Sequence, residues 1–411
     1  MKLLSTPKPL CSSKKSPKTI ALITGTRAEW GLLYPLAKAL DTSAIFTLNL
    51  IVTGAHLCKA LGDTYKEIQS DGFHITHKIP ILDDLGTNAL NSAQSIANAI
   101  VAFSEYFAQN TPDMVVLLGD RYEAFGVAIA AANLNIPIAH INGGESTQGA
   151  NDEYMRHCIS KMSYLHFPST ELYAKRIIQL GEDPKRVFNV GSLAVENIHN
   201  TPLLPKPTLA KKLHINEAFL DKFCVLTFHP TTLESTNPAK EITLLIQALL
   251  QSDYNILATK ANADAGGWAI NDLLSLYAKT YSKRLVLCAS LGRVMYLSAL
   301  KCASFVIGNS SSGLSEAPIL KVPTINIGNR QKGRYMPDSV LCINPNLHDK
   351  KRYMQEVLDA IATLQSPSYQ STLSHPHPFG EGKSAEKITK VLEDTFQYGE
   401  INLQKAFYDI H

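Results

Sequence analysis

Short apolar runs alternate with longer amphipathic stretches along almost the whole chain, and this alternation constrains the fold more than any other feature. The runs at residues 19–24 and 46–53 are rich in Ile, Leu, Val and Thr, as expected of strands buried on both faces. The stretches at 29–40 and 57–69 follow them and are predicted to be helices. A repeated strand–helix order places parallel strands side by side under a cover of helices. The sequence therefore predicts an α/β protein.

The alternation falls into two series. The first continues with strands predicted at 114–118, 136–141 and 165–168, helices at 124–133 and 172–180, and a closing segment at 187–192. The second has strands predicted at 223–228, 255–258, 285–287, 305–308 and 322–327, with helices at 239–251 and 384–396. Between them lie Pro202, Pro205 and Pro207. Proline neither continues a helix nor donates within a central strand, so this segment is predicted to be a linker.

We therefore expect two Rossmann-type doubly wound domains that face each other across a cleft. A chain of 411 residues is too long for one core, which supports two domains. The expected divisions are a flexible Lys/Ser/Pro-rich tail (1–18), an N-terminal domain (19–200), the linker (201–207), a C-terminal domain (208–383), and a last helix with its tail (384–411).

Composition narrows the class of protein. Hydrophobic residues make up 45% and charged residues 18%, which fits a globular enzyme, and no apolar run is long enough for a membrane span. Five lysines in the first 18 residues exceed the net charge of +3, so the remaining chain presents no basic surface for nucleic acid. That tail has no long apolar segment, so a secretory signal is not expected. The seven cysteines form no Cys-x-x-Cys pair, which argues for reduced thiols in the cytoplasm and against a zinc site.

Charged side chains gather where two neighbouring strands of the first series end. Asp120 and Arg121 follow the run at 114–118, and Asn142 and Glu145 follow the run at 136–141, with Asp152 shortly beyond. The carboxyl ends of parallel strands meet at one edge of a sheet, where α/β proteins build their sites. Any one of these acids could be a helix cap or a solvated loop residue, but the cluster as a whole favours chemistry.

Two turns have the composition of anion sites. Gly25-Thr26-Arg27 lies between the first strand and first helix, and Gly308-Asn309-Ser310-Ser311-Ser312-Gly313 lies after a strand of the second series. Backbone N–H groups at a helix start favour an anion, hydroxyls suit a diphosphate, and Glu316 one turn later could bind ribose hydroxyls. Well-capped helices would explain both turns about equally well. His229, at the end of a strand, is a candidate general acid or phosphate contact, or a histidine bonded to backbone.

Six motifs, in order from about Thr24 to Lys390, together resemble the hydrolysing UDP-N-acetylglucosamine 2-epimerases. They are Gly25-Thr26-Arg27, Gly119-Asp120-Arg121, the block from His140 to His157, Phe228-His229-Pro230, the turn from Gly308 to Glu316, and Gly328-Asn329-Arg330-Gln331. The resemblance implies a GT-B-like fold with the active site in the interdomain cleft. It also implies a place in sialic acid or related nonulosonate biosynthesis and conversion of UDP-N-acetylglucosamine to N-acetylmannosamine and UDP. The reaction passes through 2-acetamidoglucal, by elimination of UDP and then hydration.

The resemblance assigns roles residue by residue. Asp120, Glu145, Asp152 and His229 fall on catalytic positions. Substrate and UDP contacts are expected from Arg27, Arg121, Asn142, Asp264, Ser310, Ser311, Glu316 and Arg330. Asn142 stands where the family commonly has a carboxylate, so it cannot act as acid or base, and Glu145 is expected to compensate. The diphosphate is expected to leave toward two helix N-termini.

The resemblance leaves three matters open. UDP-N,N'-diacetylbacillosamine, the 2,4-diacetamido substrate of legionaminic acid synthesis, is an alternative substrate, while a non-hydrolysing epimerase and a non-catalytic UDP-sugar sensor are alternative functions. The only expected partners are the UDP-sugar and a second copy in a homodimer or homotetramer, with neither nucleic acid nor membrane. No cofactor or metal is expected, so activity should persist in EDTA.

Overall fold

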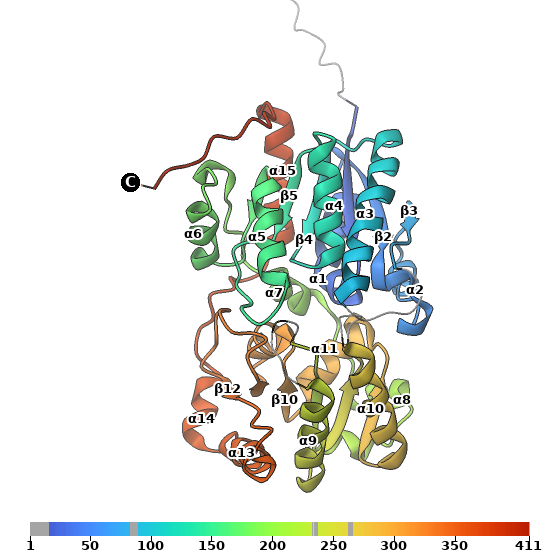
Figure 1. The fold of residues 1–411 in the computed structure, drawn as a ribbon, viewed down its shortest axis with the longest axis vertical. Coiled ribbons are helices and arrows are strands. Elements are labelled where there is room, and N and C mark those ends of the chain that lie inside the picture. Colours follow the sequence, from blue (N-terminus) through green and yellow to red (C-terminus); the bar gives the residue numbers. More distant parts are fainter. Residues whose placement is uncertain (1–15, 83–88, 232, 234–236, 262–265, 411) are drawn as a thin grey trace, which may run out of the picture.

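The computed structural model describes residues 16–82, 89–231, 233, 237–261 and 266–410. These residues form two six-stranded sheets, one in each half of the chain (Figure 1). The first sheet contains β1 (Lys18–Thr24), β2 (Phe46–Thr53), β3 (His77–Ile79), β4 (Met114–Leu118), β5 (Ile138–Ile141) and β6 (Leu165–Phe167). The second contains β7 (Phe223–Thr227), β8 (Asn255–Thr259), β9 (Leu285–Cys288), β10 (Phe305–Gly308), β11 (Thr324–Ile327) and β12 (Val340–Ile343).

Both sheets have the same topology. The first has the order β3-β2-β1-β4-β5-β6 and the second β12-β11-β10-β7-β8-β9, with every neighbouring pair parallel. Counted from the first strand of each half, both orders are 3-2-1-4-5-6, the doubly wound arrangement. The predicted pair of Rossmann-type halves is confirmed. The order reverses at β1/β4 and β7/β10, and ligands of such sheets bind outside the carboxyl ends of strands at these points.

Helices cover both faces of each sheet. The first half contains α1 (Arg27–Asp41), α2 (Tyr65–Ser70), α3 (Ala89–Gln109), α4 (Tyr122–Asn133), α5 (Asp152–Met162), α6 (Glu171–Gln179) and α7 (Leu193–Asn200). The second contains α8 (Lys206–Leu213), α9 (Pro238–Gln251), α10 (Gly267–Thr280), α11 (Gly292–Cys302), α12 (Glu316–Ile319), α13 (Lys350–Thr363), α14 (Pro367–Thr372) and α15 (Ser384–Tyr398). In β1, Ile20 and Leu22 pack toward α1, while Ala21 and Ile23 pack toward α3 and α4. Burial on both faces explains why this strand is a continuous apolar run.

Helix α15 returns to the first half after the chain has completed the second sheet (Figure 1). Ala385, Ile388 and Leu392 join the core beneath α1 and β1, although they follow the second sheet in sequence. Where the chain first passes from the first half to the second, α8 begins at Lys206, inside the segment predicted to be a linker. Its prolines lie at the N-cap and in the first turn, where a missing N–H costs a helix nothing.

Two local predictions were wrong or incomplete. Residues 57–69 do not form one helix, because Gly62 and Asp63 have left-handed φ values of 97° and 49°. Two short 3₁₀ turns precede α2 instead. The segment at 187–192 does not form a strand and contributes an isolated β-bridge between Val187 and His166. Within the part of the chain that the structure describes, no helix combines the length and apolarity needed to cross a bilayer.

Candidate active site

One cavity of about 260 Å³ lies between the two halves, at the carboxyl ends of strands from both sheets. Eleven of the twelve residues predicted for the site line it: Arg27, Asp120, Arg121, Asn142, Glu145, Asp152, His229, Ser310, Ser311, Glu316 and Arg330. The twelfth, Asp264, lies outside the described residues. Residues far apart in sequence thus share one site, which is what two facing doubly wound halves should produce.

Asp120 follows β4 directly, on a turn that Gly119 opens with a φ of +80°. Its carboxylate accepts a hydrogen bond from the guanidinium of Arg156, which is fully buried, and lies 3.6 Å from Nη2 of Arg334. Burial raises the pKa of Asp120, but the positive charges of Arg156 and Arg334 outweigh burial and hold the pKa below its usual value. Asp120 is therefore an anion at neutral pH.

Glu145 belongs to the loop that follows β5, and its Oε2 lies 3.0 Å from Nη2 of Arg334. The shape of this loop depends on Glu153 in the first turn of α5. Glu153 accepts hydrogen bonds from the hydroxyl of Ser146 at 2.8 Å, from the amide of Thr147 and from Arg156 at 3.1 Å. It is therefore an organising residue of the site. The acidic pair at the start of α5 was the only signal for it in the sequence.

His229, which follows β7, and Arg330 are both hydrogen-bonded to Asn309 in the second half of the chain. The backbone N–H of His229 donates to Oδ1 of Asn309 at 2.7 Å, and the Asn309 amide donates back to the His229 carbonyl at 2.8 Å. This pair fixes the position of His229 at the cavity wall. Arg330 donates to the carbonyl of Asn309 at 3.3 Å and lies 3.8 Å from the carboxylate of Asp152. Arg330 thus links the serine turn (residues 310–312) of the second half to the acidic loop (residues 142–152) of the first half.

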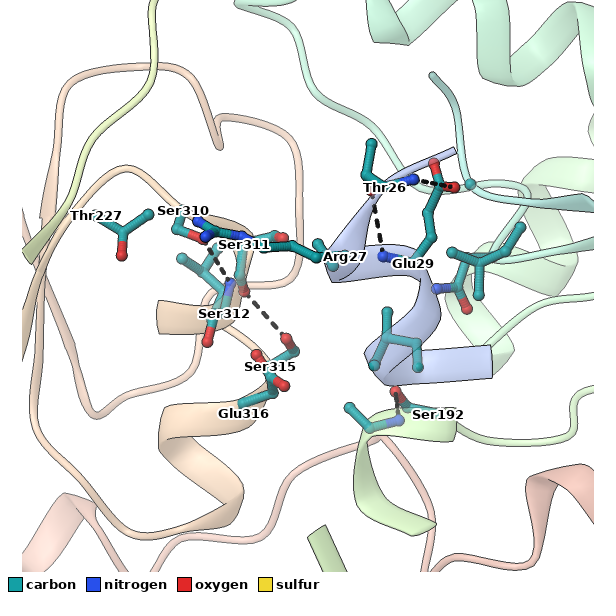
Figure 2. A pocket seen from close by; sticks show the side chains of 18 of the residues that line it. Thr26, Arg27, Glu29, Ser192, Thr227, Ser310, Ser311, Ser312, Ser315 and Glu316 are labelled. Atoms are coloured by element: carbon teal, nitrogen blue, oxygen red, sulfur yellow. Dashed lines mark hydrogen bonds between the residues drawn. The ribbon is translucent and has the colours of Figure 1, made fainter. Parts of the chain in front are cut away.

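The amino end of α1 is less available to an anion than the sequence suggested. Thr26 and Glu29 form a capping box, and Oε2 of Glu29 accepts hydrogen bonds from the amides of Gly25 and Thr26 at 2.6 and 3.2 Å. The carboxyl group of Glu29 therefore occupies two backbone amides at the start of α1. Arg27 instead reaches across to the second half, as Figure 2 shows, and donates to the carbonyls of Ala289 and Lys260.

The serine turn opposite Arg27 differs from the expected helix start. Residues Ser311–Gly313 form a 3₁₀ turn, and Glu316 is the first residue of α12, which is only four residues long, so a second long helix N-terminus is absent at this turn. Ser312 accepts a hydrogen bond from the hydroxyl of Tyr296 at 2.7 Å. Ser310 and Ser311 line the cavity (Figure 2). Burial raises the pKa of Glu316.

Arg121 is paired within its own half. Its Nε and Nη2 lie 3.1 and 3.4 Å from the Glu123 carboxylate, and its guanidinium lies 5.0 Å from the centre of the Tyr122 ring. A substrate contact by Arg121 stays a prediction. Asn142 has a left-handed φ of 62°, which asparagine tolerates better than most residues. Among the described residues, no group of three or more His, Cys, Asp or Glu could hold a metal ion.

A family model described as UDP-N-acetylglucosamine 2-epimerase matches residues 38–393. Among curated relatives, the GDP/UDP-N,N'-diacetylbacillosamine 2-epimerase (hydrolyzing) of Campylobacter jejuni is 46% identical over 79% of this chain and 84% of its own length. The polysialic acid biosynthesis protein P7 of Escherichia coli is 37% identical over 96% of this chain and 98% of its own. The UDP-N-acetylglucosamine 2-epimerase of Neisseria meningitidis is 32% identical over 96% of this chain and all of its own.

Solved structures agree on the architecture. The S. aureus MnaA–UDP co-structure has a TM-score of 0.74 at 19% identity and covers 95% of this chain and 100% of that chain. The Neisseria meningitidis UDP-GlcNAc 2-epimerase bound to UDP-GlcNAc has a TM-score of 0.71 at 18% identity, covering 91% and 99% of the two chains. At these identities the likeness establishes the fold, which is the GT-B-like arrangement of two Rossmann-type halves.

Proposed function

Since the chain belongs to the UDP-N-acetylglucosamine 2-epimerase family, we propose that it is a hydrolysing enzyme that converts a UDP-2-acetamido sugar and water into UDP and the free 2-epimer. With UDP-N-acetylglucosamine the product is N-acetylmannosamine. The observation that carries the proposal is the composition of the cavity. Asp120, Glu145 and Asp152 from the first half face the serine turn of the second. Two of the relatives described above carry names of UDP-sugar 2-epimerases, and one of these names specifies hydrolysis.

The first step is elimination of UDP. A carboxylate removes the proton from C2, the C1–O bond breaks, and UDP leaves with the bonding electrons as the 2-acetamidoglucal forms. We assign proton transfer to Asp120, Asp152 and Glu145, of which Asp120 is held as an anion by its arginines. Asn142 cannot share this task, because an amide does not ionise.

Stabilisation of the departing diphosphate falls to Arg27, His229 and the hydroxyls of Ser310 and Ser311, which line the same cavity. Preorganised donors at the point where charge develops are commonly the largest contribution to catalysis. We place the ribose hydroxyls at Glu316.

The second step is hydration of the glycal. Water adds its oxygen to C1, and a proton is delivered to C2 on the face opposite to the one from which it left. The net change is cleavage of the C1–O bond with inversion at C2. Because water takes the place of UDP at C1, the sugar is released free, and the net reaction is a hydrolysis.

Proton NMR of the purified enzyme with UDP-N-acetylglucosamine in D₂O containing EDTA tests the proposal. The expected result is free UDP and N-acetylmannosamine that carries deuterium at C2. UDP-N-acetylmannosamine as the product would identify a non-hydrolysing epimerase. Binding of UDP without turnover of either candidate substrate would identify a sensor.

UDP-N,N'-diacetylbacillosamine is the second candidate substrate, and the 46% identical relative named for this sugar favours it. Comparison of kcat/KM for the two UDP-sugars distinguishes the candidates. A preference for the diacetamido sugar would assign the enzyme to legionaminic acid synthesis, and the opposite preference to N-acetylmannosamine supply for sialic acid.

We further propose that the enzyme works in the cytoplasm as a homodimer or homotetramer. Leu90 and Val101 on α3 and Tyr154 on α5 are exposed apolar side chains of the first half that a second copy of the chain would cover in such an assembly. The mass of the purified protein by light scattering tests the assembly.

A further inference from the structure

Arg334 comes from the second half of the chain but neutralises acids of the first half. Its Nη2 lies 3.0 Å from the carboxylate of Glu145 and 3.6 Å from that of Asp120. The three side chains are 18%, 12% and 14% exposed, so water screens the interaction only weakly. No motif in the sequence indicated this residue.

The backbone on either side of Arg334 is bound to the first half. The carbonyl of Lys332 accepts from the amide of Gln148 at 2.9 Å, and the amide of Tyr335 donates to the hydroxyl of Tyr173 at 3.0 Å. The arginine can therefore reach both carboxylates only while residues 332–335 lie against the acidic loop. If the two halves separate, the cation leaves with the second half.

Other charged groups act on Asp120 as well. Arg156 on α5 contacts it, Arg330 and the buried His140 on β5 act on it from nearby, and Glu145 and Asp152 act on Arg156. Among the cations, Arg156 belongs to the same half as Asp120 and stays with it whether or not the halves are in contact. Arg330 and Arg334 belong to the second half, so the contributions of both depend on the contact between the halves, and Arg334 is the one that also pairs with Glu145.

We propose that Arg334 is a positioning residue through which closure of the two halves sets the electrostatic environment of Asp120 and the position of Glu145. In the closed arrangement Asp120 lies against the cations of Arg156 and Arg334, and Glu145 is held 3.0 Å from Arg334. In an open arrangement Asp120 keeps only its ion pair with Arg156, and Glu145 loses its ion pair with Arg334. The inference rests on the proposed function for its catalytic meaning, but its electrostatic content is independent of the substrate.

The test compares Arg334→Met and Arg334→Lys with Arg176→Met as the matched control. Arg176 crosses the same interface, donating to the carbonyls of Gly144 and Gly333 at 3.4 Å each, and it pairs with no carboxylate among the described residues. We expect the acid limb of kcat/KM to move toward higher pH by about one unit in Arg334→Met, the lower end of the effect of an adjacent opposite charge. Arg334→Lys should restore part of this shift, and Arg176→Met should leave the limb in place.

A carbon-13 NMR titration of the Asp120 carboxyl, assigned by its loss in Asp120→Asn, gives a readout that needs no substrate. We expect a higher midpoint in Arg334→Met than in the wild type, with Arg334→Lys between them. If Arg334→Met does not fold, the Lys variant alone carries the comparison. Equal midpoints in the wild type and in the Arg334 variants would overturn the inference. A shifted midpoint in an enzyme that turns over neither UDP-sugar would overturn the proposed function and leave the inference intact.

Discussion

The imidazole Nε2 of His140 lies 2.7 Å from the carbonyl oxygen of Gly119, the residue immediately before Asp120. Its other ring nitrogen, Nδ1, lies 3.0 Å from the hydroxyl of Ser160. Burial lowers the pKa of His140 to about 3, so the ring is neutral at physiological pH. The carbonyl can only accept, so Nε2 carries the hydrogen and the Ser160 hydroxyl donates to Nδ1. The histidine thereby fixes the turn that presents Asp120.

His140→Ala removes both hydrogen bonds and leaves a cavity in a fully buried position. We expect a loss of about 2–4 kcal/mol in the free energy of unfolding, since a part-buried carbonyl loses its partner and packing is lost. Urea denaturation followed by circular dichroism measures the change. His74→Ala, at an exposed position, should stay within about 0.5 kcal/mol of the wild type. An equally small effect for His140 would contradict the assigned role.

Asp120→Asn keeps the size of the side chain but cannot take a proton from C2. We expect kcat to fall by about 10²–10⁴-fold, the range of a general acid–base group, while the Kd for UDP changes by less than about threefold. Asp113→Asn is the matched control, because Asp113 lies at the opposite, amino end of β4 and pairs with Lys18. Its kcat should be unchanged. Release of UDP by a coupled assay and calorimetric titration with UDP separate the two effects, and undiminished turnover in Asp120→Asn would remove Asp120 from the mechanism.

Glu29 should make the stability of the protein depend on pH. Burial, together with the charge of Glu123, raises the pKa of Glu29 from 4.5 to about 8. Between these values the folded chain keeps a proton that the unfolded chain has lost, so stability falls as pH rises, by up to about 1.4 kcal/mol per pH unit. Glu29→Gln has no such proton to lose, and we expect its stability relative to the wild type to increase between pH 5 and pH 8.

Urea denaturation at several pH values across that range tests this prediction. Glu171→Gln, at an exposed position on α6, controls for the chemical change itself. A difference between Glu29→Gln and the wild type that does not vary with pH would show that Glu29 is ionised in the folded protein.

Lys405 should stabilise the first half through the buried carboxylate of Glu182. Its Nζ lies 2.5 Å from Oε2 of Glu182, whose other hydrogen-bond partners are His166 and Lys161. Burial raises the pKa of Glu182, but these three partners outweigh it and lower the pKa to about 2. Lys405→Met should cost about 1–3 kcal/mol at pH 7, because it weakens the compensation of a buried anion. This contribution should disappear as pH falls from about 4.5 toward 2.

Lys390→Met is the control for Lys405→Met, since Lys390 pairs with Asp394 on the exposed surface of α15. An exposed pair of this kind contributes little, so the urea midpoint should not change. Equal effects of the two substitutions would show that the pair of Lys405 with Glu182 contributes no more to stability than an exposed pair.

Local patterns predicted the strands that build the site. The strands at 46–53, 114–118 and 305–308 were predicted with the observed bounds. The last two are buried along their whole length, which is why they are unbroken apolar runs. The polar residues that follow these runs could be placed at the cleft for the same reason. The long helix α3 was not predicted, although its 21 residues are amphipathic.

Interactions between distant parts of the chain could not be predicted. Arg334 pairs with Glu145 because two separately wound sheets face each other, and neither residue's neighbours in sequence reveal that contact. A capped start of the first helix was one interpretation of the sequence, but the occupation of the Gly25 and Thr26 amides by Glu29 required coordinates. Sequence patterns report which residues an element buries, while the choice of partner across a cleft depends on the whole fold.

The return of α15 to the first sheet has a consequence for synthesis of the protein on the ribosome. Ala385, Ile388 and Leu392 complete a core whose other members are made long before them. A nascent chain that has emerged as far as residue 380 still exposes the apolar groove beneath α1, while the second sheet is already able to form. The amino-terminal half therefore cannot complete its core until the last helix has left the ribosome.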